Sequence, residues 1–218
     1  MTLMKSKPRV AKYGEVFTPA WLVDQILDDV GAQTQQIDAR FLDPACGTGN
    51  FLTEILRRKL KVVDKGYAHS CASKREHALV ALMSLYGIEL LGDNVAECRA
   101  ALHMQFAEFL EIDESNDFHA AAAYVLSQNI VNGDALVLRE VGDCSVKFSE
   151  WNLHAKGRYA SQEYRFEAVK DLPAINGNSK LLDTKGNLNV LPVGAGRVWT
   201  VSELAEAYYI TNWVHHEI

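Results

Sequence analysis

The chain has 218 residues, of which 48% are hydrophobic, and carries a formal net charge of −6 at pH 7. A chain of this length can bury one substantial core, so we expect a single domain. No apolar run approaches the roughly 20 residues that a membrane-spanning helix requires, and residues 1–15 lack the apolar core of a secretory signal. These features predict a cytoplasmic protein with no membrane association.

The acidic net charge also argues against a surface covered with phosphate-binding groups, because nonspecific DNA affinity comes largely from lysine and arginine. Any contact with nucleic acid must therefore be local. The most basic segments are an N-terminal arm at residues 1–12 and a cluster formed by Arg57, Arg58, Lys59 and Lys61. Charge runs of this kind are usually solvated surface, and we expect the same here.

Four cysteines are scattered along the chain without any CxxC pair: Cys46, Cys71, Cys98 and Cys144. Neither a metal site nor a disulfide framework is predicted from this spacing. Cys46 lies between glycines and an acidic residue, where we expect a small packed side chain rather than a nucleophile.

The first predicted helix begins at Thr18 and Pro19, which are typical of an N-cap and a first turn, and its apolar residues recur at helical spacing up to Gly31. We expect residues 32–38 to form a polar linker. Short strands and helices then alternate. The predicted strands cover residues 40–43, 86–90 and 130–131. The predicted helices cover residues 51–60, 78–85, 95–109 and 119–127. Residues 61–74 form a polar stretch in this prediction, and Asp93 or Asn94 is expected to cap the helix at 95–109.

This alternation predicts an α/β fold, namely a Rossmann-like, doubly wound and mostly parallel sheet with helices on both faces. In such sheets, ligands bind at the carboxyl ends of the strands. Asp43, Glu89 and Asp134 all fall at predicted strand ends. We therefore expect the three carboxylates to lie at one edge of the sheet.

The pattern becomes irregular in the last third of the chain. Residues 146–148 predict one more strand, residues 155–198 suit hairpins, and residues 200–210 predict a last helix. We expect an irregular, β-rich extension at residues 151–218 that completes the domain formed by residues 13–150.

The segment FLDPACGTGNF at residues 41–51 is the most informative part of the sequence. Phe41 and Leu42 are apolar enough to end a buried strand, while Gly47 and Gly49 allow a tight turn and a close approach to a ligand. The helix that follows would direct its amide groups at that ligand. A GxG pair also occurs in ordinary turns, so the neighbouring segments decide its meaning.

DPACGTGNF at residues 43–51 resembles the S-adenosylmethionine (SAM) loop of the amino-methylating DNA methyltransferases, especially the adenine-N6 group of restriction-modification systems. Three further segments keep that family's order, namely GEVFTP at 14–19, YGIEL at 86–90 and NGDAL at 132–136. The resemblance covers residues 13–136. It implies the SAM-dependent methyltransferase fold, SAM as cofactor and DNA as partner, with a possible specificity subunit.

The resemblance implies a set of cofactor-binding residues: Thr18, Asp43, Ala45, Gly47, Gly49, Phe51, Glu89 and Asp134. In this family, Thr18 and Asp43 would face the methionine end of SAM, and the glycines would let the cofactor lie against the backbone. Glu89 would accept the ribose hydroxyls, and Asp134 would accept the adenine amino group. Outside this context, Thr18 reads as a helix cap, Glu89 as a surface residue and Asp134 as a turn residue.

The spacing also bears on the kind of nucleotide. Asp43 and Glu89 are much farther apart in the sequence than the roughly 20 residues of a dinucleotide fingerprint, so NAD is a poor fit.

One element of the family is missing. Adenine-N6 methyltransferases usually carry, after the strand that follows NGDAL, an asparagine or aspartate, two prolines and an aromatic residue, which hold the flipped target base. At the corresponding place this chain has Ser149, Glu150, Trp151 and Asn152. Ser149, Glu150 and Trp151 are the candidate catalytic residues, as acceptors and a stacking surface. An ordinary strand end with a packed tryptophan explains them equally well.

Three functions remain open at this point. The first is adenine-N6 methylation of DNA, degenerate or dependent on a partner. The second is a non-catalytic SAM-binding accessory subunit or sensor of a restriction-modification type system, which the missing element and the few residues beyond 152 favour. The third is methylation of RNA or protein, because a cofactor site does not identify the acceptor.

Overall fold

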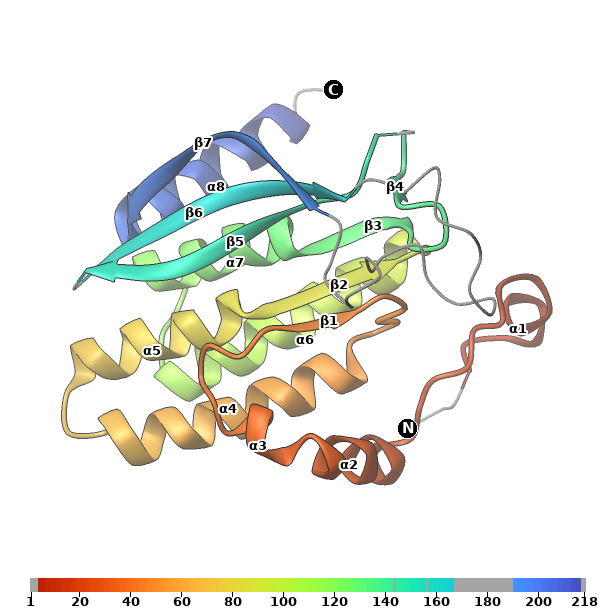
Figure 1. Cartoon of the computed structure of the whole chain (residues 1–218), viewed down its shortest axis with the longest axis horizontal. Helices are drawn as coiled ribbons and strands as arrows, with labels where there is room; N and C mark the ends of the chain where they lie inside the picture. The colour runs from red at the N-terminus through yellow and green to blue at the C-terminus, as the bar shows by residue number, and fades with distance from the viewer. Residues whose placement is uncertain (1–3, 143, 156, 167–189, 217–218) are drawn as a thin grey trace.

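The computed structural model describes residues 4–142, 144–155, 157–166 and 190–216 (Figure 1). The elements up to the second strand are α1 (Lys7–Tyr13), α2 (Ala20–Asp29), α3 (Gly31–Thr34), β1 (Phe41–Asp43), α4 (Asn50–Tyr67), α5 (Cys71–Met83) and β2 (Leu85–Glu89). The remaining elements are α6 (Gly92–Leu110), α7 (Asp117–Asn129), β3 (Ile130–Asp134), β4 (Arg139–Glu140), β5 (Lys147–Ala155), β6 (Arg158–Phe166), β7 (Val190–Thr200) and α8 (Val201–His216).

The strands form two sheets. In the first, β1, β2 and β3 are neighbours and run parallel, and the two-residue β4 pairs antiparallel with β3. The predicted parallel sheet is therefore confirmed for these three strands. In the second sheet, β5, β6 and β7 pair antiparallel in chain order. This sheet contacts α5 and α7 through β5, and α8 packs against α7 and β7 (Figure 1).

The two faces of the parallel sheet are covered differently. On one face, Leu85 and Ile130 pack with apolar residues of α4 to α7, and all four of these helices contact β2. On the other face, Tyr86 and Ile88 pack with Phe148 and neighbouring residues. Among the described residues, no helix contributes to this second cluster. The described residues therefore do not confirm the prediction of helices on both faces, because strand residues and the segment after β3 form this second cluster.

Helix α4 is longer than the sequence pattern suggested. Its buried residues Leu52, Ile55, Leu56, Leu60 and Val63 follow intervals of three and four, which keeps one side of the helix in the core up to Tyr67. The predicted polar stretch at 61–74 is thus mostly helical. The polar residues there occupy the outer side of α4.

Lys59 corrects the prediction of a solvated basic cluster. Its side chain is 0% exposed, and Nζ donates hydrogen bonds to the carbonyl oxygens of Ile37 and Ala39 and to Oγ of Ser84. Burial lowers the pKa of Lys59 to about 7. Lys59 thereby satisfies the backbone that leads into β1, which is a structural role.

The other local predictions differ at element ends. The N-cap of α2 is Pro19 rather than Thr18, and the N-cap of α6 is Leu91 rather than Asp93 or Asn94; neither has a side-chain cap hydrogen bond. The expected strand at 146–148 extends through Ala155 as β5. Residues 167–189, inside the region expected to form hairpins, lie outside the described residues. The described helices include none that is long and apolar enough to span a membrane.

Candidate functional site

The carboxylates predicted at strand ends do lie at one edge of the parallel sheet. Asp43 ends β1, Glu89 ends β2 and Asp134 ends β3. All three line one cavity of about 1250 Å³. Of the eight residues expected to bind a cofactor, only Gly49 is not part of the cavity lining. The parallel arrangement of three neighbouring strands explains this convergence, because their carboxyl ends point the same way.

The glycine loop between β1 and α4 has a backbone that only glycine adopts easily. Gly47 has a φ of +55° and Gly49 a φ of +91°. A Cβ atom at Gly49 would lie 2.7 Å from Sγ of Cys98 in α6. Gly49 therefore lets the start of α4 pack closely against α6. Cys46, beside this contact, is buried as a packed side chain, as expected.

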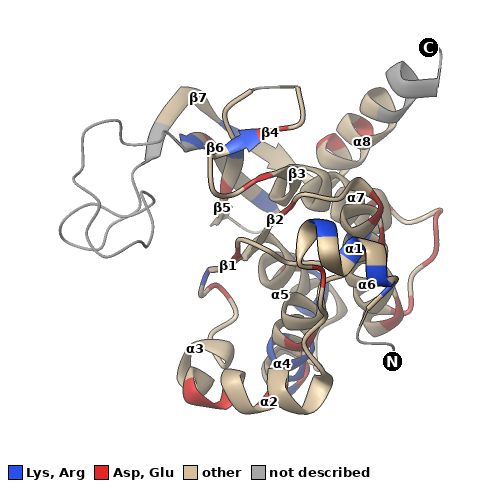
Figure 2. Cartoon of the chain, turned by 90° about the vertical axis from the view of Figure 1, so that its right-hand side faces the viewer, with Lys and Arg blue, Asp and Glu red and all other residues tan. Residues whose placement is uncertain are grey.

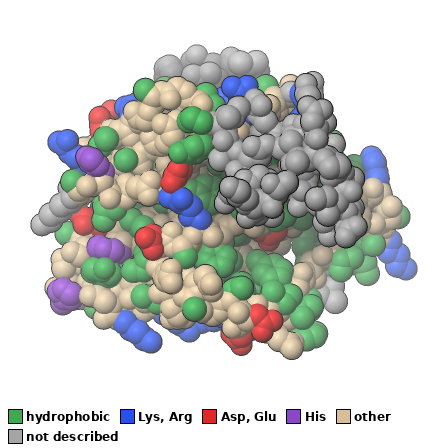
Figure 3. Space-filling model, in the orientation of Figure 1, with side chains coloured by type: hydrophobic (Ala, Val, Ile, Leu, Met, Phe, Trp, Pro, Cys, Tyr) green, Lys and Arg blue, Asp and Glu red, His purple; other side chains and the backbone are tan. Residues whose placement is uncertain are grey.

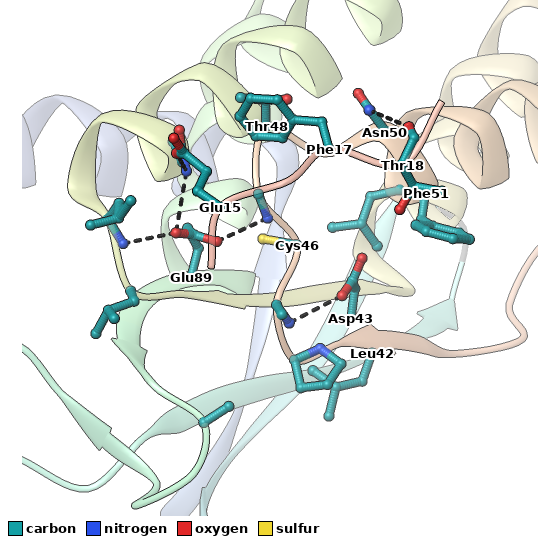
Figure 4. Close-up of a pocket in the computed structure, with 18 of the residues that line it drawn as sticks. Glu15, Phe17, Thr18, Leu42, Asp43, Cys46, Thr48, Asn50, Phe51 and Glu89 are labelled. Atoms are coloured by element: carbon teal, nitrogen blue, oxygen red, sulfur yellow. Dashed lines mark hydrogen bonds between the residues drawn. The ribbon is translucent and has the colours of Figure 1, made fainter. Parts of the chain in front are cut away.

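Glu89 is held from several directions (Figure 4). Oε2 accepts a hydrogen bond from the backbone amide of Gly47 at 3.0 Å, and Oε1 accepts one from the amide of Leu91 at 2.9 Å. Nδ2 of Asn94 donates to Oε1 at 3.3 Å. The carboxylate is thus fixed against the glycine loop. Its oxygens still have acceptor capacity toward the cavity, since a carboxylate offers about four lone-pair sites.

A second carboxylate, Glu15, lies beside Glu89 and was not singled out in the sequence. Oε1 of Glu15 accepts a hydrogen bond from Nδ2 of Asn94 at 2.8 Å, so this amide bridges the two glutamates. Arg9 forms two hydrogen bonds with Glu15, at 2.7 and 2.6 Å. These contacts lower the pKa of Glu15, Arg9 being the largest cause. The sequence feature that could have identified Glu15 is its position within the segment GEVFTP.

Asp43 occupies a different environment from Glu89 and lies on the other side of Cys46 in the glycine loop (Figure 4). Oδ1 accepts a hydrogen bond from the backbone amide of Ala45 at 3.1 Å. Burial raises the pKa of Asp43, and the nearby charge of Glu89 raises it further. A half-buried carboxylate for which the described residues provide no cationic partner is suited to receive a positively charged group from a ligand.

The segment 14–19 forms one wall of the cavity. The backbone carbonyl of Thr18 accepts a hydrogen bond from Nδ2 of Asn50, the first residue of α4, at 2.9 Å. The ring of Phe17 would lie 3.4 Å from a Cβ atom at Gly47. The segment thus packs directly on the glycine loop, and Thr18 and Phe51 both line the cavity.

The opposite wall comes from β3 and the turn after it. Oδ1 of Asp134 accepts a hydrogen bond from the amide of Leu136 at 2.8 Å, and the Asp134 side chain lines the cavity. Leu136 and Leu138 from this turn and Leu90 after β2 add apolar surface. On the face drawn in Figure 3, hydrophobic side chains gather to the right of centre, beside the residues drawn in grey. Apolar walls with a few polar groups are typical of small-molecule sites.

The candidate catalytic residues lie elsewhere. Ser149, Glu150 and Trp151 are within β5, not at a strand end, and none of them lines the cavity. Trp151 is 6% exposed and donates a hydrogen bond from Nε1 to Oδ1 of Asn129 at 3.0 Å. Glu150 forms an ion pair with Arg40 at 2.5 Å. These contacts match the alternative interpretation, a strand with a packed tryptophan.

The site therefore combines a glycine loop with three carboxylates at the ends of parallel strands. Within the described ranges, no group of His, Cys, Asp and Glu side chains could hold a metal ion. The family model for MmeI, DNA-methyltransferase domain, matches residues 24–155, more than half of the chain. No curated protein and no solved structure matches the chain significantly. The chain belongs to the family of the MmeI DNA-methyltransferase domain.

Proposed function

We propose that this protein binds SAM in the cavity at the carboxyl ends of β1 to β3 and transfers its methyl group to the N6 amine of adenine in DNA. Membership of a DNA-methyltransferase family implies a methyl donor of the SAM type and DNA as substrate. The observation that carries the proposal is the meeting of Asp43, Glu89 and the Gly47 loop in one cavity.

The donor groups of the cavity suit the parts of SAM. Glu89, with both oxygens oriented by backbone amides, would accept the two ribose hydroxyls. Asp43 would pair with the methionine ammonium group, since it has no cationic partner among its described contacts. The first turn of α4 has backbone amides without intrahelical partners, and Gly49 provides no side-chain cap, so these amides suit the methionine carboxylate.

SAM, when bound, supplies an activated methyl group on a sulfonium. The residues of this chain contribute positioning: Glu89 and Asp134 hold the nucleoside, and Asp43 fixes the amino acid end. Placing two reactants in line can supply much of the rate enhancement of such a transfer. The cavity is large enough for the cofactor, since pockets of about 300–1000 Å³ hold ligands of drug size.

A second function is supported by a specific observation. Trp151 and Glu150 are engaged in contacts inside the protein, at Asn129 and Arg40, rather than at the cavity. A protein that keeps the cofactor site without a base-binding element suits a non-catalytic SAM-binding accessory subunit or sensor, with a partner chain providing chemistry or recognition. In either case, the proposed cofactor site is the same.

Methyl transfer from labelled SAM to varied DNA substrates separates the two functions. The first predicts labelled N6-methyladenine, and Glu150→Ala and Trp151→Phe test whether β5 contributes. Loss of methylation in these variants, with unchanged SAM affinity and unchanged thermal unfolding, would support a role in catalysis. SAM binding without transfer to any DNA would favour the accessory subunit, and absence of SAM binding would refute both.

A further inference from the structure

The N-terminal segment is connected to the cavity by a chain of hydrogen bonds. Arg9 in α1 contacts Glu15 through Nε and Nη2. Glu15 accepts from Asn94 in α6, and the same amide nitrogen of Asn94 donates to Glu89 at the end of β2. Nη2 of Arg9 also lies 3.4 Å from Oδ1 of Asn94. Four residues from separate segments thus form one network that ends at the proposed ribose acceptor.

The inner part of this network is shielded from solvent. Asn94 is 1% exposed, and Glu15 and Glu89 are each 9% exposed. Two buried carboxylates that share one amide donor repel each other unless a cation neutralises one of them. Arg9 supplies that cation with paired hydrogen bonds, a geometry in which arginine binds carboxylates specifically.

The outer part of the network anchors α1. Arg9 also contacts Asp93, at 2.8 Å through Nη1, and Lys5 pairs with Asp93 and Glu97. Figure 2 shows the basic residues of α1 beside α6. Asp93 and Glu97 are about half exposed, so these pairs contribute little on their own. The partly buried contact between Arg9 and Glu15 is therefore the one that affects the cavity.

We propose that Arg9 is a positioning residue for cofactor binding, acting through Glu15 and Asn94 on the carboxylate of Glu89. This inference depends on the proposed function, since it assigns Glu89 to the cofactor. Arg9 does not itself line the cavity. Its removal leaves Glu15 charged beside Glu89, which draws the amide of Asn94 toward Glu15 and disturbs the orientation of Glu89. The N-terminal segment thereby controls the affinity of the site.

The test compares SAM affinity, measured by calorimetry on the full chain, across matched variants. Arg9→Ala is expected to weaken SAM binding about tenfold. Arg9→Lys keeps the charge without the paired geometry and should restore part of the loss. Lys7→Ala removes a cation from the same helix, outside the network, and should bind SAM like the wild type.

A double variant separates positioning from general structural damage. Neutralising Glu15 in Arg9→Ala/Glu15→Gln removes the unpaired charge, so this variant should bind SAM more tightly than Arg9→Ala. Equal SAM affinity of wild type and Arg9→Ala, or effects of the two substitutions that simply add, would overturn the inference. Should Arg9→Ala not fold, Arg9→Lys with and without Glu15→Gln gives the same comparison. A wild-type protein that binds no SAM refutes the proposed function instead.

Discussion

The backbone amide of Gly47 donates a hydrogen bond to Oε2 of Glu89 over 3.0 Å, across 42 residues of sequence. This bond ties the glycine loop after β1 to the end of β2. The loop and the carboxylate therefore form one hydrogen-bonded unit rather than two independent binding elements. A change in either partner should affect the other.

Replacing Glu89 tests this unit. Glu89→Gln keeps the size but has one acceptor oxygen, so either Gly47 or Leu91 loses its partner, and charge-assisted bonds to a ligand are lost. We expect SAM affinity to fall about 10- to 100-fold in Glu89→Gln and further in Glu89→Ala, measured by calorimetry. Amide hydrogen exchange should rise at either Gly47 or Leu91 in Glu89→Gln and at both residues in Glu89→Ala. Unchanged SAM affinity in Glu89→Ala would remove Glu89 from the site.

Gly49 should be intolerant of a side chain. An alanine there would have a φ of +91° and a Cβ atom 2.7 Å from Sγ of Cys98. We expect Gly49→Ala to lower the free energy of unfolding by about 2–5 kcal/mol, measured by urea denaturation. Adding Cys98→Ala should recover the part of the lost free energy of unfolding that comes from the contact with Sγ. It should not recover the part that comes from the positive φ of residue 49.

Gly66 provides the matched control within the same helix. A Cβ atom there meets nothing within 4 Å, and its φ lies outside the positive range. Gly66→Ala should stabilise the protein by at most about 1 kcal/mol, because alanine has the higher helix propensity and Gly66 lies in the last turn of α4. A Gly49→Ala protein as stable as Gly66→Ala would contradict the close packing of α4 on α6.

The charge of Asp43 should lower the stability of the protein at pH 7 while it favours the binding of SAM. Burial raises the pKa of Asp43, so the folded protein holds this proton more tightly than the unfolded chain does. The free energy of unfolding contributed by this group therefore falls as pH rises above the ordinary pKa of aspartate. Asp43→Asn should lose this pH dependence and unfold at a higher temperature at pH 7, while SAM affinity falls about 10- to 100-fold. Thermal unfolding at pH 4 and pH 7 checks the expected stability, and calorimetry checks the expected SAM affinity.

Lys59 gives a second pH dependence. Burial lowers its pKa to about 7 from an ordinary value of 10.5, so between these values the unfolded chain binds more protons. The free energy of unfolding contributed by Lys59 should therefore rise with pH across that window, by at most about 1.4 kcal/mol per pH unit. Lys59→Met should abolish this rise and destabilise the protein by about 2–4 kcal/mol, because the carbonyl groups of Ile37 and Ala39 lose their donor.

Exposed Lys61, two residues later in the same helix, is the control for Lys59. Lys61→Met should change the free energy of unfolding by less than about 0.5 kcal/mol at any pH. Urea denaturation between pH 7 and 9 makes the comparison. Equal pH profiles of wild type and Lys59→Met would exclude titration of Lys59 in the folded protein.

The sequence predicted what depends on local pattern. The ends of β1, β2 and β3 carry Asp43, Glu89 and Asp134, and apolar strands followed by polar residues are visible without a structure. The convergence of these residues then follows from parallel pairing alone. The covering of the second face of the sheet does not follow from parallel pairing, because it depends on which distant segment packs against Tyr86 and Ile88.

Residues that act through long-range contacts were missed for the same reason. Asn94 looks like a helix cap in the sequence, but its amide bridges Glu15 and Glu89, which come from distant segments. Lys59 looks like surface beside Arg57 and Arg58, although its side chain points into the core. A polar residue on a helix can cap, be solvated or be buried with partners. Only the tertiary structure distinguishes these cases.

The most direct test is isothermal titration of SAM into the wild-type protein, with the Glu89→Ala variant titrated in parallel. The proposed site predicts one SAM per chain bound at micromolar concentrations by the wild type and a loss of binding in the variant. Absence of heat with the wild-type protein, or equal binding by both proteins, would contradict a cofactor site built on Gly47 and Glu89.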